Sequence, residues 1–115
     1  MPTAEKRMYT AVSNILRTVP EENAFNFYRA VDSPLGVKAA NIEEFLDQLK
    51  KIEPASIEFH MGRHDFEKWI GMLGDATLVK QISSLGKREM PADEMKEQII
   101  RLVRMRVGRL KKLSK

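Results

Sequence analysis

Residues that begin or end helices recur at short intervals from Asn41 onwards, and they restrict this chain to helices that are mostly short. Asn41 is followed three residues later by Glu44, which is the pattern of a capping box. Pro54 suits the first turn of a helix, Gly74 suits the end of one, and Asp75 can cap the next. Hydrophobic residues recur at spacings of three and four between these points. The pattern therefore predicts a run of short amphipathic helices.

The same patterns assign elements to the rest of the chain. We expect helices over 4–19, 41–52, 54–61, 65–73, 75–85 and 91–113, with Gly62 interrupting the third. Residues 56–61 also alternate polar and apolar side chains, so a strand is the alternative there. An aromatic and β-branched run at 24–31, turn residues at 32–36 and the segment 37–40 predict a β-hairpin. The fold class is therefore α+β, a mostly helical single domain (1–115) of five to six helices with one small hairpin.

Length and composition exclude several kinds of protein. A chain of 115 residues buries about two-thirds of its surface, which is enough for one core but leaves little room for a large substrate cavity and a cofactor domain as well. The absence of cysteine excludes disulfides, thiolate metal sites and a cysteine nucleophile. No apolar stretch has the length of a signal segment or a membrane span. We expect a cytoplasmic protein that does not bind a membrane.

Charge is distributed unevenly along the chain. Residues 1–100 carry 13 basic and 16 acidic side chains, a net charge of −3, whereas residues 101–115 carry seven basic side chains and no acidic one. The net charge of +4 therefore combines a mildly acidic body with a strongly basic end.

The final predicted helix, 91–113, separates apolar from basic side chains. At 100° per residue, an apolar stripe centred on Ile99 lies opposite most of the cations. The candidate contacts for a polyanion are Arg101, Arg104, Arg109, Lys111, Lys112 and Lys115. Arg106 departs from the pattern because it projects from the apolar stripe. Either a carboxylate of the body pairs with Arg106, or the helix projects beyond the core and leaves it in solvent.

A central segment resembles a known family. The relevant residues are Phe25-Asn26-Phe27, Asn41-Ile42-Glu43-Glu44-Phe45, Ser56-Ile57-Glu58-Phe59-His60, and Asp65-Phe66-Glu67-Lys68-Trp69-Ile70 before Leu73-Gly74-Asp75. From 24 to 85 the order of elements and these motifs are similar to a family of small archaeal and bacterial domains of unknown function. The resemblance implies a cytoplasmic protein of archaeal type and brings no established activity.

Two histidines form the one candidate site for metal binding or catalysis. His60 and His64 lie four residues apart, with Asp65 next to them as a third potential ligand. The glutamate of a zinc-protease helix is missing, and Gly62 lies between the histidines. The simpler interpretation is that His60 is partly buried and donates to a backbone carbonyl, while His64 caps a helix. We expect no bound metal or cofactor.

Three hypotheses for function follow. The leading one is a non-enzymatic binding module whose basic final helix contacts a polyanion, either nucleic acid without strong sequence preference or an acidic protein. The alternative is a protein-interaction or homodimerisation module that uses the apolar face of the same helix. The second alternative is a small metal-binding protein or enzyme at His60 and His64. A basic tail that only maintains solubility is the competing explanation for the charge.

Overall fold

Six α-helices and a two-stranded antiparallel sheet make up the part of the chain that the structure describes, which confirms the predicted α+β single domain. This computed structural model describes residues 4–114, with side chains from Met8 onwards. The elements are α1 (Ala4–Leu16), a 3-10 turn η1 (Glu21–Asn23), β1 (Phe25–Ala30), β2 (Ser33–Ala39), α2 (Ile42–Lys51), α3 (Pro54–Arg63), α4 (Asp65–Leu73), α5 (Ala76–Gly86) and α6 (Ala92–Leu113).

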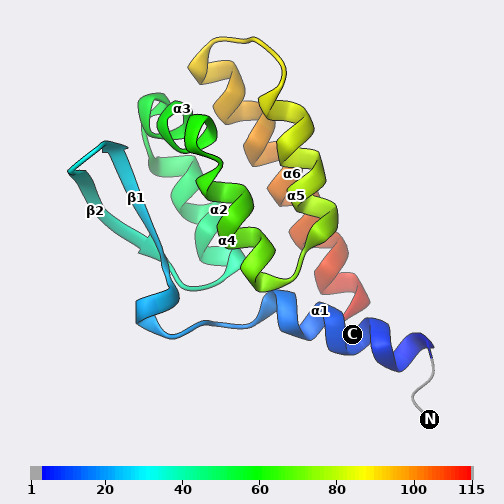
Figure 1. Ribbon diagram of the computed structural model, residues 1–115. Coiled ribbons are helices and arrows are strands. Elements are labelled where there is room, and N and C mark those ends of the chain that lie inside the picture. Colours follow the sequence, from blue (N-terminus) through cyan, green and yellow to red (C-terminus); the bar gives the residue numbers. More distant parts are fainter. Residues whose placement is uncertain (1–3, 115) are drawn as a thin grey trace.

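The longest helix, α6, runs along the body and contacts α1, α2, α3 and α5 (Figure 1). The hairpin covers one side of the helices, with β1 against α3 and β2 against α2. Helix α1 packs near the end of α6, where Val12 and Ile15 form a small cluster with Leu110. The two ends of the described chain are therefore joined by apolar contacts.

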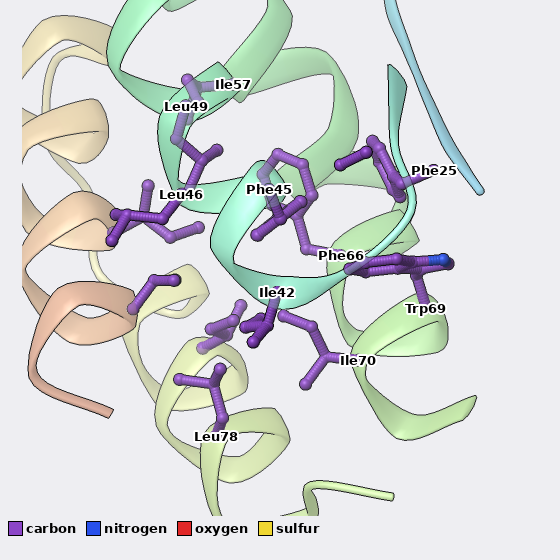
Figure 2. Packing of buried hydrophobic residues seen from close by; sticks show 14 of the residues in the cluster. Phe25, Ile42, Phe45, Leu46, Leu49, Ile57, Phe66, Trp69, Ile70 and Leu78 are labelled. Carbon is purple, nitrogen blue, oxygen red and sulfur yellow. The ribbon is translucent and has the colours of Figure 1, made fainter. Parts of the chain in front are cut away.

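Aromatic rings from the hairpin and from α2 and α4 form the centre of the core (Figure 2). Phe25 makes edge-to-face contacts with Phe27, Phe45 and Trp69, and these pairs add to the energy of apolar burial. Phe45 and Phe66 are fully buried. The alternation that predicted strand β1 therefore also directs Phe25 and Phe27 into the core.

The predicted start residues are confirmed at two helices. Asn41 accepts a hydrogen bond from the Glu44 backbone N–H, and the Glu44 carboxylate accepts one from the backbone N–H of Ala40, one residue before the cap, so a variant of the predicted capping box forms. Asp75 accepts from the backbone N–H of Leu78 at the start of α5. Short-range hydrogen bonds of this kind depend only on neighbours along the chain.

Three boundaries differ from the predictions. Helix α1 ends at Leu16 and not at Val19, because the Val19 N–H bonds the carbonyl of Ala40 and Pro20 follows. The hairpin turn comes earlier than 32–36, because Asp32 adopts a left-handed conformation with φ of 59° and lets β2 begin at Ser33.

The third boundary concerns α3. Gly62 does not interrupt this helix, and the strand considered for 56–61 is absent. Gly62 is exposed, so it weakens the helix without having to end it. The helix ends at His64, whose φ of 61° is left-handed and whose N–H bonds the carbonyls of His60 and Met61.

One ion pair fixes α6 to the junction between α4 and α5. Arg106 Nε donates to Asp75 Oδ2 at 2.7 Å, and Arg106 Nη2 donates to Asp75 Oδ1 at 3.0 Å. The Asp75 side chain is 1% exposed and that of Arg106 is 17% exposed. Of the two possibilities for Arg106, the structure shows the one with a carboxylate partner. This two-point contact has the geometry that suits a guanidinium and a carboxylate.

We expect Asp75→Ala to lower the free energy of unfolding by about 3–5 kcal/mol, because it removes the α5 cap and leaves the Arg106 charge partly buried without its partner. Arg106→Met added to it should recover part of the loss, since the unpaired charge is then gone. Urea unfolding of the wild type, both variants and the exposed control Asp47→Ala measures this. A loss no larger than the roughly 1 kcal/mol of a cap would contradict the role of the pair.

Candidate nucleic-acid interface

The apolar face of α6 is buried against the rest of the chain. Its buried residues are Met95, Ile99, Val103, Val107 and Leu110. Leu102 is half-buried, and Leu113 is 36% exposed. The face that the dimerisation hypothesis assigns to a second copy is therefore largely occupied within a single chain.

The opposite face of α6 exposes most of the cations that the sequence singled out. Arg101, Arg104, Arg109 and Lys112 are exposed, and none of them forms an ion pair with any side chain in the range 8–114. Lys111 differs, because its Nζ lies 3.2 Å from a carboxylate oxygen of Glu43 on α2. Lys115 lies outside the described residues. The structure thus groups four of the six predicted contacts on one solvent-facing surface.

A shallow groove beside this surface brings in residues that the sequence analysis missed. It has a volume of about 390 Å³, and its lining comes from α5, α6 and the link that follows α5. The lining residues are Lys80, Gln81, Ser84, Leu85, Arg88, Gln98 and Leu102. The only hint in the sequence is that 76–86 contains a lysine and no acidic residue.

His60 is held from both sides of its ring and does not resemble a metal ligand or a base. Its side chain is buried, with Nε2 accepting the backbone N–H of Tyr28 at 2.9 Å and Nδ1 lying 2.9 Å from Asp65 Oδ2. The first bond requires the neutral tautomer in which Nδ1 carries the proton and donates to Asp65. His60 therefore accepts from a backbone amide, which corrects the expectation that it donates to a carbonyl.

His60 helps to satisfy the backbone hydrogen bonds of β1 on the edge that does not pair with β2. Ser56 Oγ donates to the carbonyl of Tyr28 at 2.7 Å, so two side chains of α3 satisfy both backbone groups of this one residue. A groove of about 690 Å³ lies between β1 and the helices α3 and α4, with His60 and Asp65 among its lining residues. Because both nitrogens of the His60 ring are engaged, His60 offers that groove no vacant base.

The environment of His60 favours its neutral form. Burial of the ring lowers the pKa of His60 below its ordinary value of 6.5, and the hydrogen bond to Asp65 opposes this effect only in part. Arg63, which lies 3.3 Å from Asp65 through its Nε, also favours the neutral ring through its positive charge. Protonation at Nε2 would place an N–H against the Tyr28 N–H and break their hydrogen bond.

His64 does not join His60 in a site. Its exposed side chain lies 3.1 Å from a Glu67 carboxylate oxygen, which also accepts from Ser83 Oγ at 2.6 Å. The backbone of His64 forms the junction between α3 and α4, but its side chain makes no capping hydrogen bond, contrary to the expected role. No three His, Cys, Asp or Glu side chains in the described part of the chain are placed to hold a metal ion.

No helix among the described residues is long and apolar enough to cross a membrane.

A comparison with protein families finds a match that reaches well beyond the segment 24–85. A family of unknown function, DUF5752, matches residues 5–104. The chain belongs to this family. The DUF5752 match includes nearly all of α1 and α6 as far as Arg104, whereas Arg109, Lys111 and Lys112 follow its last residue. Neither the curated proteins nor the solved structures provide a match to this DUF5752 chain.

We expect the stability of this protein to fall as the pH drops below about 6.5, because the unfolded chain then takes up a proton that the folded His60 resists. Each unit by which the pKa of His60 is lower in the folded state contributes about 1.4 kcal/mol to that fall. Urea unfolding between neutral and mildly acidic pH should show a shallower dependence for His60→Gln than for the wild type. Lys50→Gln, which changes an exposed side chain and removes no histidine, is the control and should keep the wild-type dependence.

Proposed function

We propose that this protein is a non-enzymatic module that binds the backbone of nucleic acid through the exposed face of α6. The observation that carries the proposal is the separation of the cations of α6 from Arg101 onwards into two groups. Arg106 and Lys111 have carboxylate partners, whereas Arg101, Arg104, Arg109 and Lys112 face solvent without an ion pair to the described side chains. The second group is available to contact phosphates.

The arrangement of the four exposed cations favours a uniformly charged partner. They span about 17 Å of a single helix, at a rise of 1.5 Å per residue. The stretch 98–114 contains no acidic residue that would repel a phosphate. The phosphates of a nucleic acid repeat at regular spacing and can meet all four cations together, whereas an acidic protein surface usually mixes charge with other groups. Nucleic acid is therefore preferred over the acidic-protein alternative.

Contacts of this kind bind without reading sequence. Arginine and lysine on phosphate oxygens fix position and supply affinity, whereas sequence is read through base edges. We therefore propose weak, salt-sensitive binding that differs little between sequences.

The proposal predicts a defined dependence of affinity on salt. If each of the four cations meets one phosphate of a duplex, these four contacts alone give log K a slope of about −3.6 against log salt. Replacing Arg101, Arg104 and Arg109 with glutamine should reduce the magnitude of the slope by about 2.7, because three phosphate contacts are lost. Fluorescence anisotropy with labelled oligonucleotides at increasing salt measures both values. Substitution is preferable to truncation after residue 100, because truncation would also remove the buried Val103, Val107 and Leu110 from the core.

The matched control removes the same charge from elsewhere. Lys50, Lys51 and Lys68 are exposed cations on α2 and α4 that form no ion pair in the described part of the chain, and glutamine at all three lowers the net charge equally. This control should keep a slope near that of the wild type. A slope that falls equally in both triple variants would show that only net charge matters and would contradict the proposal. Binding to polyglutamate but not to oligonucleotides would favour the acidic-protein alternative instead.

A further inference from the structure

The groove between α5 and α6 has a charged lining of one sign. Lys80 and Arg88 are the charged residues that line it, and no acidic side chain in the described part of the chain does so. Gln81, Ser84 and Gln98 add neutral polar groups that can donate hydrogen bonds. Neither Lys80 nor Arg88 forms an ion pair with a described side chain, and both are exposed. Leu85 and Leu102 give the rest of the lining an apolar character, so an extended anionic group would meet the groove at Lys80 and Arg88.

The groove adjoins the exposed cations of α6. Gln98 and Leu102 form its α6 wall, and at 100° per residue Arg109 lies within about 20° of each of them around the helix. Arg101 lies about 60° from Gln98, on the outer side. Because α5 and α6 pack side by side (Figure 1), Lys80 of α5 and Arg88 of the link after it line the same groove as Gln98 and Leu102 of α6. Arg104 lies about 60° beyond Arg101, at the edge of the exposed face, and next to it Lys111 pairs with Glu43 of α2.

Acidic residues at the start of α6 mark one end of the basic surface formed by its exposed cations. Asp93, Glu94 and Glu97 occupy the first part of α6, before Gln98. A polyanion would therefore contact the helix from Gln98 towards its C-terminal end. The favourable stretch is the part of α6 on which the four exposed cations lie.

The composition of this surface distinguishes between forms of nucleic acid. The segment 76–113, which includes both helices and their link, contains no Phe, Trp, Tyr or His. Proteins that bind single strands without reading sequence use aromatic side chains on which bases stack, each worth about 1–3 kcal/mol. This surface therefore offers no ring on which a base can stack, whereas its cations suit a duplex, which presents negative charge most densely, at about one phosphate per 1.7 Å of axis.

We propose that the groove between α5 and α6 binds the sugar-phosphate backbone of a double-stranded nucleic acid. Lys80 and Arg88 would contact phosphates on one side of it, and the cations of α6 would contact phosphates on the other. This inference rests on the proposed function, and it adds a second row of contacts and a preference for duplex over single strand. The shared chemistry is a phosphodiester backbone, which duplex DNA and duplex RNA both supply.

The test compares duplex DNA, duplex RNA and a single strand, each of about 20 nucleotides per strand and mixed sequence, by fluorescence anisotropy at equal salt. We expect at least one duplex to bind about tenfold more tightly than the single strand, and comparison of the two duplexes identifies the source. With Lys80 and Arg88 added to the four cations of α6, six contacts give a duplex salt slope of about −5.4, and Lys80→Gln with Arg88→Gln should bring it to the value of about −3.6 for α6 alone. The control, Lys50→Gln with Lys51→Gln, should keep the slope, and thermal unfolding should show that both double variants remain folded.

The outcomes separate this inference from the proposed function. If neither duplex nor single strand binds at low salt, the proposed function itself fails. If nucleic acid binds through Arg101, Arg104 and Arg109 but the Lys80 and Arg88 variant keeps the wild-type slope, only the role of the groove is refuted. Equal or tighter binding of the single strand would refute the duplex preference.

Discussion

The contact between Arg106 and Asp75 fixes one point at which the last helix meets the body. Asp75 is buried, and its two oxygens accept from the guanidinium and from the first turn of α5. A buried carboxylate is strongly unfavourable unless such donors surround it, so neither residue is stable in this place without the other. The pair therefore holds α6 against the junction of α4 and α5, 31 residues away along the chain.

The position of α6 decides which of its side chains can meet a partner. With Ile99, Val103 and Leu110 buried against the body, the apolar face contributes to the core, and the opposite face presents its cations to solvent. Folding also places α5 beside α6, which adds Lys80 and Arg88 to the same side. The basic surface is thus produced by two helices, although most of its charge lies in one of them.

His60 has an equivalent role for the hairpin. A two-stranded sheet has two open edges and is marginally stable alone. Ser56 donates to the carbonyl of Tyr28, and His60 accepts from its N–H. These two hydrogen bonds attach the unpaired edge of β1 to α3 and take the place of the bonds that a third strand would make. Because this contact needs a neutral imidazole, the histidine contributes to structure in a way that depends on pH.

Much of the local structure follows from the sequence alone. The capping box at Asn41 and Glu44, the cap at Asp75 and the inward face of β1 depend on neighbours two to four residues apart, and such spacings are visible in the sequence. The basic end and the outlying position of Arg106 on its helix could also be read there. The tertiary structure alone decided that Arg106 pairs with Asp75, that His60 bonds Tyr28 and that Lys80 lies beside α6. These contacts join segments far apart in the chain, and they are set by how the helices pack, which periodicity does not encode.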